Sequence, residues 1–273
     1  METGKPIPGR FAGKVVIVTG GSSGIGLATV EELVKEGASV AFSSIEQEAG
    51  VEVEQRLLAA GHDVLFCYGD MAEEQFCKSI VDRTLAKWGT VRGLVNNAFS
   101  FLGKGPDVTR ADWERVLTVG PIAFATMAQQ VAEPMRAAGG GAIVNVSSIS
   151  AFIAQPNRWT YNSAKGAVHT LTKCMALDLA PYGIRVNSVS PGWTWTREVL
   201  KAAAGDRIRW EPVWGQYHML ERLAEPVEIA RPILFLLSAD ASFITAADLA
   251  VDGGYQGLGS EGLGRTSHFV GSR

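Results

Sequence analysis

The chain has 273 residues, of which 47% are hydrophobic and 19% are charged, and its net charge is −3. This length suits one large α/β domain. The slightly negative charge gives no sign of the basic surface that binds nucleic acid. No apolar run reaches the roughly 18 residues of a membrane span, and the polar segment 1–14 lacks the apolar core of a signal peptide, so we expect neither a membrane nor a nucleic-acid partner. The three cysteines are odd in number, which favours free thiols in a reducing, cytoplasmic compartment, and no cysteine or histidine cluster predicts a metal site.

The first predicted strand, residues 14–19, is a continuous apolar run, typical of a strand buried on both faces of a parallel sheet. A glycine-rich turn, GGSSGIG, follows at 20–26, and helical periodicity begins at 27. Such a turn lets the backbone approach a diphosphate, which the free N–H groups of the helix N-terminus attract. We therefore predict a dinucleotide site, although a glycine turn alone is often only a tight turn. The predicted cofactor contacts here are Gly20, Ser22, Ser23, Gly24, Ile25 and Gly26.

Strands and helices continue to alternate along the chain. We expect further strands at 38–44, 62–68, 91–96, 142–147 and 184–190, and a last one that leads into 248–252. Helices are expected at 27–36, 47–60, 72–88, 110–138, 159–180 and 227–237. This alternation predicts a single-domain, doubly wound parallel α/β sheet of about seven strands, a Rossmann fold, with helices on both faces. The catalytic domain should span residues 1–255, followed by a Gly/Ser-rich tail at 256–273.

The predicted helix 159–180 carries two reactive side chains, Tyr161 and Lys165. Residues four apart on a helix share a face, so the phenol and the ammonium should point the same way. A cation beside the phenol should lower the tyrosine pKa from about 10 by about 2–3 units, toward the range of efficient general acid–base catalysis. The alternative is an ordinary pair on an amphipathic helix, which YxxxK alone would favour.

Several motifs, in order and at similar spacing, resemble the short-chain dehydrogenase/reductase family over nearly the whole chain. They are residues 19–26, 96–98, Ser148, Tyr161 with Lys165, 191–192 and 251–254. The resemblance implies an NAD or NADP cofactor and hydride transfer between it and a secondary alcohol or ketone. The alternative of another class is a non-catalytic, dinucleotide-binding redox sensor, which the intact catalytic residues disfavour.

The resemblance also implies a role for each matching residue. Tyr161 would exchange a proton with the substrate oxygen, Lys165 would lower its pKa and hold the nicotinamide ribose, and Ser148 would hydrogen-bond the substrate oxygen. Ser147 competes for that last role, but the family spacing favours Ser148. The further cofactor contacts implied by position are Asp70, Met71, Asn97, Pro191, Gly192, Thr194 and Thr196, with Asn97 equally able to be a structural bridge between loops.

Two departures from the family pattern lie near the predicted site. Phe99 replaces the glycine that usually follows Asn-Asn-Ala, so its side chain must point away from the cofactor or reshape the ribose site, unless the substitution is simply tolerated. Gly120 replaces an asparagine that accompanies a helix kink and a proton-relay water in the family. We hypothesise that Pro121 restores the kink and frees the Leu117 carbonyl; the alternative is a weaker relay and a slower enzyme.

A third departure concerns the cofactor. NAD-binding members carry a carboxylate at the end of the second strand, where this chain has Ser43 and Ser44, the latter a predicted contact. The basic residues that usually bind NADP are also missing there, so the choice between NAD and NADP stays open.

The tryptophan-rich segment 193–223 corresponds to the variable lid of the family, which could close over a ligand. Trp193 and Trp195 are predicted substrate contacts because aromatic faces suit rings, although some of these rings could only anchor the lid. Arg158 could hold a substrate carboxylate or be a solvated charge. We expect a sugar, a sugar acid or another cyclic hydroxy compound as substrate, with a 3-oxoacyl thioester as the rival.

Assembly is predicted from the resemblance alone. Family members usually form dimers or tetramers through the two long helices, here 110–138 and 159–180, so we expect a homotetramer. We also hypothesise that the tail, 257–273, reaches the active site of a neighbouring subunit.

Overall fold

The computed structural model describes residues 4–259, in which seven strands form one parallel sheet in the order β3-β2-β1-β4-β5-β6-β7. The order reverses between β1 and β4, and the crevice outside the carboxyl ends of the strands at such a point is where open parallel sheets bind ligands. The predicted doubly wound sheet is confirmed. The strands are β1 (Val15–Val18), β2 (Ser39–Ser44), β3 (Val64–Tyr68), β4 (Gly93–Asn96), β5 (Gly141–Val146), β6 (Ile184–Pro191) and β7 (Asp248–Val251).

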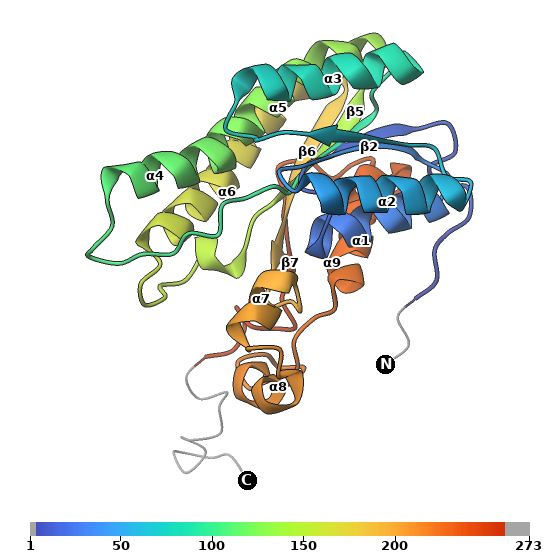
Figure 1. Ribbon diagram of the computed structural model, residues 1–273. Coiled ribbons are helices and arrows are strands. Elements are labelled where there is room, and N and C mark those ends of the chain that lie inside the picture. Colours follow the sequence, from blue (N-terminus) through green and yellow to red (C-terminus); the bar gives the residue numbers. More distant parts are fainter. Residues whose placement is uncertain (1–3, 260–273) are drawn as a thin grey trace.

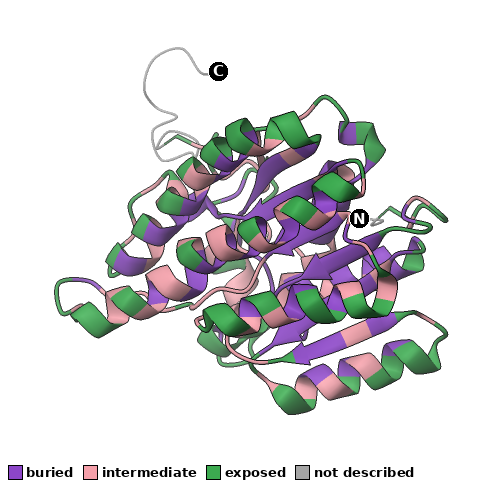
Figure 2. Cartoon of the chain, turned by 90° about the horizontal axis from the view of Figure 1, so that it is seen from above, coloured by how far each residue is buried: buried purple, intermediate pink, exposed green. Residues whose placement is uncertain are grey.

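Helices cover both faces of this sheet (Figure 1). One face carries α1 (Gly24–Lys35), α2 (Gln47–Ala59) and α9 (Pro226–Leu237), and the other carries α3 (Glu74–Trp88), α4 (Arg110–Leu117), α5 (Ala123–Ala137) and α6 (Trp159–Leu179). Figure 2 shows the strands almost wholly buried and the helices exposed along their outward faces. This layering explains the continuous apolar strands, because each strand has a helical layer on both sides.

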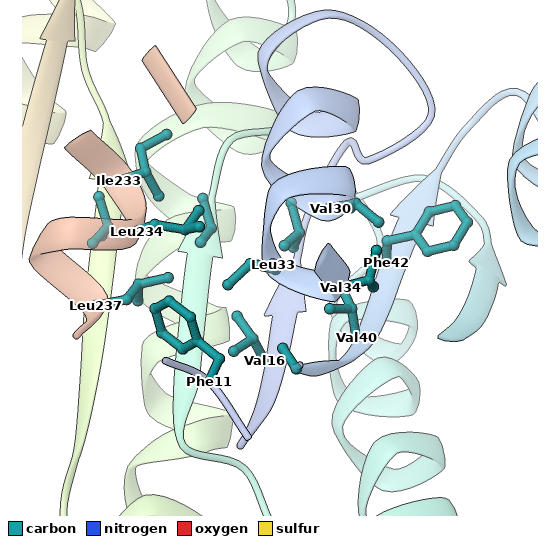
Figure 3. Packing of buried hydrophobic residues seen from close by; sticks show 14 of the residues in the cluster. Phe11, Val16, Val30, Leu33, Val34, Val40, Phe42, Ile233, Leu234 and Leu237 are labelled. Carbon is teal, nitrogen blue, oxygen red and sulfur yellow. The ribbon is translucent and has the colours of Figure 1, made fainter. Parts of the chain in front are cut away.

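Two apolar clusters fill the spaces between sheet and helices. Successive residues of β1 alternate between them, since Val16 and Val18 belong to one cluster and Ile17 to the other. Figure 3 shows the first cluster, in which Val16 lies beneath Leu33 of α1 and Leu234 of α9. All of these side chains are essentially inaccessible to water, so the sheet is a rigid base for the loops that follow its strands.

The long helix predicted at 110–138 is broken. α4 ends at Leu117, a π-helical segment spans Thr118–Ile122, and α5 begins at Ala123. Gly120 inside that segment has non-helical backbone angles, φ −89° and ψ −110°, and Pro121 follows it. The predicted kink is therefore confirmed, because a proline without an N–H and a glycine without a side chain both weaken a regular helix. The free carbonyl of Leu117 stays a prediction.

The lid contains two short helices that the sequence did not predict, α7 (Arg197–Ala202) and α8 (Arg207–Gly215). They extend beyond the sheet next to β7 (Figure 1). Their N-cap residues were the missed signal, since the Thr196 and Asp206 side chains accept hydrogen bonds from the backbone N–H groups of Val199 and Arg209.

The predicted tail reaches beyond the part of the chain that the structure describes, which ends at residue 259. The domain boundary at 255 and the tail's contact with a neighbouring subunit therefore stay predictions. Within residues 4–259, no helix is long and apolar enough to cross a membrane.

Candidate active site

A cleft of about 560 Å³ lies where the carboxyl ends of β1 to β6 meet. Its walls come from the loop that follows each strand, so segments far apart in sequence meet in one place. All predicted site residues line it except Gly26 and Trp195. The sequence did not single out Phe101, Arg115, Gln155 or Arg197, which also line the cleft.

The turn after β1 forms one end of the cleft. Gly20 has a positive φ of 69°, and a Cβ placed on Gly26 would approach the Gly20 carbonyl oxygen to 2.0 Å. Gly26 therefore acts by close packing of α1 under the turn rather than by lining the cleft. The Asn97 amide donates to the carbonyls of Thr19 at 2.9 Å and Gly20 at 3.1 Å, so it bridges two loops as well as lining the cleft.

Two serines and two ion pairs shape the neighbouring wall. The Ser44 hydroxyl lies 2.7 Å from that of Ser22, and the Arg197 guanidinium of the lid reaches Glu46 at 2.6 Å. Asp70 pairs with Arg115 at 2.7 Å. Burial alone would raise the pKa of Asp70, but the hydrogen bond and charge of Arg115 hold it below its ordinary value.

Tyr161 and Lys165 lie on the same face of α6, as predicted. The Lys165 ammonium is 5.7 Å from the centre of the Tyr161 ring, and it donates a hydrogen bond of 2.8 Å to the Val146 carbonyl at the end of β5. Ser148 hydrogen-bonds the Tyr161 phenol, whereas the Ser147 hydroxyl points to the Lys165 carbonyl at 3.5 Å. Of the two serines, Ser148 is the one positioned to share a substrate oxygen with Tyr161.

The predicted fall in the Tyr161 pKa is wrong in this structure. Burial raises the pKa of Tyr161, and the Ser148 hydrogen bond and the Arg158 charge only partly oppose that rise. Burial also lowers the pKa of Lys165 to about 7. The physical reason is that both side chains are enclosed, and removal from water disfavours the phenolate and the ammonium alike.

Phe99 lies inside the site. Its ring centre is 3.7 Å from the Lys165 ammonium and 5.5 Å from the centre of the Tyr161 ring. A Cβ placed on Gly120 would approach the Phe99 ring to 2.6 Å. The ring therefore reshapes the site, and the two departures from the family pattern are in contact with each other.

The two tryptophans predicted as substrate contacts lie in different surroundings within the lid. Trp193 lines the cleft and stacks on Trp214 with ring centres 5.1 Å apart. Trp195 instead packs in the lid's own core against Leu223 and donates to Glu211 at 2.6 Å. We correct its assignment as a substrate contact, since the apolar lid core encloses that ring.

His218 is a further residue that the sequence did not predict. It is buried, and its Nε2 accepts a hydrogen bond of 3.2 Å from the Trp193 N–H. A scattered histidine gives no sequence signal for such a role. This bond fixes the start of the lid next to Gly192, at the end of β6.

The residues present fit a nicotinamide dinucleotide. The turn at Gly20 and the N-terminus of α1 offer close backbone approach and N–H groups to a diphosphate. When bound, that cofactor supplies or accepts a hydride. Tyr161 is placed to hold or release the proton of the substrate oxygen, Ser148 to orient that oxygen, and the lid to exclude water. The fold and this site define a nicotinamide-dependent oxidoreductase that acts on a CH–OH group.

Comparison with known proteins agrees with this class. Residues 20–256 match the family model described as enoyl-(acyl carrier protein) reductase. Cyclopentanol dehydrogenase of Comamonas sp. (strain NCIMB 9872) is 38% identical over 251 residues, which cover 90% of this chain and 98% of that protein. Cis-4-hydroxycyclohexanecarboxylate dehydrogenase of Sinomonas cyclohexanicum is 39% identical over 247 residues, covering 90% and 97%.

A solved structure supports the same assignment. It is 7α-hydroxysteroid dehydrogenase complexed with NADH and 7-oxo glycochenodeoxycholic acid, with a TM-score of 0.85 and 34% identity over 90% of this chain and 95% of that one. This chain belongs to the short-chain dehydrogenase/reductase family. It is an alcohol dehydrogenase or carbonyl reductase that uses NAD or NADP.

Proposed function

We propose that the protein interconverts a secondary alcohol and a ketone on a ring that also carries an acidic group, which binds Arg158. The observation that supports this proposal is which arginines of the cleft are paired with a carboxylate. Arg115 and Arg197 are paired with Asp70 and Glu46, whereas no carboxylate of residues 4–259 lies within salt-bridge distance of Arg158. A guanidinium beside the catalytic tyrosine without a carboxylate partner is suited to an anionic substrate.

The aromatic wall supports the ring. The Phe101 ring lies 4.8 Å from the Tyr161 ring, centre to centre, and the Arg158 guanidinium lies over Phe101 at 4.7 Å. Trp193 lines the same cleft from the lid. Such faces bind the apolar faces of a ring. The names of the relatives, a cyclopentanol and a hydroxycyclohexanecarboxylate dehydrogenase, also support a cyclic substrate.

A paired substrate panel tests the proposal. Cyclohexanol and the cis and trans 4-hydroxycyclohexanecarboxylates are each oxidised with NAD and with NADP, and formation of the reduced cofactor is followed by absorbance. Arg158→Leu should raise KM for the acid by about 10-fold or more, because a charge-assisted hydrogen bond is lost, and should leave KM for cyclohexanol nearly unchanged. An equal change for both substrates would refute the role of Arg158, and preferential reduction of a 3-oxoacyl thioester would refute the cyclic substrate.

Assembly and location are separate parts of the proposal. A homotetramer is supported by the half-exposed Ile122 and Trp159 on the kinked helix and α6, since apolar residues that remain exposed often mark subunit contacts. A cytoplasmic location is supported by the free thiols of Cys67, Cys77 and Cys174. Light scattering of the purified protein gives the mass, and a monomer at micromolar concentration would contradict the tetramer.

A further inference from the structure

Phe99, on the loop after β4, and Gly120, in the π-helical segment between α4 and α5, meet next to Lys165. We propose that Phe99 is a positioning residue, whose ring face binds the Lys165 ammonium and holds it charged beside Tyr161, and that Gly120 provides the space this ring needs. The inference concerns the proton chemistry common to the family, so it holds whichever alcohol the enzyme oxidises.

The ammonium has few other partners. Lys165 is only 3% exposed. Within residues 4–259 its ammonium contacts the Val146 carbonyl at 2.8 Å and the faces of Phe99 and, more distantly, Tyr161. None of the carboxylates in the described chain lies within salt-bridge distance of it. A cation over an aromatic face is attracted by the ring quadrupole, and the attraction grows when water is excluded. The Phe99 face at 3.7 Å therefore takes the place of a counter-ion.

The Phe99 ring packs against two other aromatic rings. Its edge contacts are with Tyr161 at an interplanar angle of 82° and with Phe124, whose ring centre is 6.3 Å away at 80°. Its backbone follows Asn97, whose amide anchors the loop to the turn after β1. Phe99 thus links the ammonium, the phenol and the sheet, which is the geometry a positioning residue requires.

Gly120 lies against the outer edge of the Phe99 ring, at Cε2 and Cζ. A Cβ at this position would lie 2.6 Å from Cε2 and 2.9 Å from Cζ of Phe99, well inside van der Waals contact. The π-helical kink brings this part of the backbone against the ring. Any larger residue at 120 would push the ring off the ammonium, so the two unusual residues depend on each other.

The first test measures the charge of Lys165 directly. In the cofactor-free protein, the rate at which a small acylating reagent modifies Lys165 is followed by mass spectrometry against pH, because only the neutral amine reacts. Phe99→Leu removes the ring face, so the ammonium loses its proton more easily. We expect the midpoint of the modification rate against pH, which reports the Lys165 pKa, to fall by about half to one pH unit.

The second test is the pH profile of kcat for alcohol oxidation. The groups that face Lys165 are Tyr161 on its own helix, the Val146 carbonyl from β5 and the Phe99 ring, while Arg158 lies near Tyr161. A less protonated lysine gives the tyrosinate less support. The acidic limb should therefore move upward by about half to one unit in Phe99→Leu.

Two further variants separate ring electronics from packing. Replacing Phe99 by ring-fluorinated phenylalanines weakens the quadrupole with little change of shape. The two midpoints, that of Lys165 modification and that of the acidic limb of kcat, should therefore shift progressively with fluorination. Phe124→Leu is the matched control, because this ring packs on Phe99 but is not among the groups that contact the Lys165 ammonium. It should lower stability and shift both midpoints by much less than Phe99→Leu does.

A double-mutant cycle tests the dependence on Gly120. Gly120→Ala alone should shift both midpoints in the same directions as Phe99→Leu, and the two substitutions together should shift them no further, since contacting residues are not additive. The proposal is overturned if fluorination leaves both midpoints in place, or if Phe124→Leu moves them as far as Phe99→Leu does.

Discussion

The two ends of the cleft carry charge in different ways. Near the turn after β1, Arg115 with Asp70 and Arg197 with Glu46 are ion pairs whose side chains remain 28–52% exposed. At the other end, Lys165 is enclosed, and a carbonyl and a ring face take the place of a carboxylate.

This difference shows which end can tune chemistry. Exposed ion pairs are screened by water and contribute little to stability, so the first end mainly shapes the cleft. An enclosed ammonium is costly to charge, and each group that touches it therefore changes its pKa measurably. Substitutions at the catalytic end should have large effects, and those at the ion pairs should have small ones.

The largest effect is expected for Tyr161→Phe. This change removes only the phenolic oxygen, so the proton of the substrate oxygen has no donor or acceptor, and kcat should fall by about 10²–10⁴-fold. Fluorescence titration with NADH and NADPH should show nearly unchanged binding. Activity within tenfold of the wild type would contradict the assignment of this residue.

Lys165→Met should reduce kcat by a similar or somewhat smaller factor, about 10²–10³-fold, because the charge that assists Tyr161 is lost. The acidic limb of the pH profile should also move upward. Steady-state kinetics from pH 6 to 10 would measure both. A profile identical in shape to that of the wild type would mean that the ammonium does not act on the phenol.

In the cofactor-free protein, the buried ammonium of Lys165 should also make the free energy of unfolding depend on pH. Burial lowers the pKa of Lys165 to about 7, whereas its value in the unfolded chain is about 10.4. Between these values the unfolded state binds more protons at this lysine. The free energy of unfolding of the wild type, measured relative to that of Lys165→Met, should therefore rise with pH, by about 2 kcal/mol from pH 7 to 9. Urea titrations of the wild type and Lys165→Met would measure it.

The methionine variant lacks the ammonium that causes this rise. Above about pH 9 the free energy of unfolding of both proteins should fall as the pH increases, because burial raises the pKa values of Cys67 and Cys77 to about 11 and the folded state then binds more protons than the unfolded state. Equal slopes for the two proteins between pH 7 and 9 would show that the ammonium is not buried as the structure has it.

The smallest effect is expected for Glu46→Gln, which breaks the ion pair between the lid and the loop after β2. An exposed pair of this kind contributes less than about 1 kcal/mol, and salt weakens it further. The unfolding free energy should therefore change little, and the remaining change should vanish in 1 M salt. A loss of several kcal/mol would contradict the distinction between the two ends.

Part of this arrangement follows from the sequence alone. The strand, glycine turn and helix from residue 15 to 35 are recognisable because buried strands, turns and helices each have a local pattern. The pairing of Tyr161 with Lys165 on one face follows from helical geometry. The kink at Gly120 was also predictable, since a proline acts on its own helix.

Other features depended on tertiary structure. Phe99 enters the site because the distant Gly120 leaves room for it, and Trp195 leaves the cleft because the lid has a small core of its own. The direction of the Tyr161 and Lys165 pKa shifts was set by burial, which no spacing of residues reveals. The periodicity of a sequence predicts local structure, because it depends on residues that are neighbours along the chain. The room around a side chain and its exposure to water depend on segments that come together only after folding.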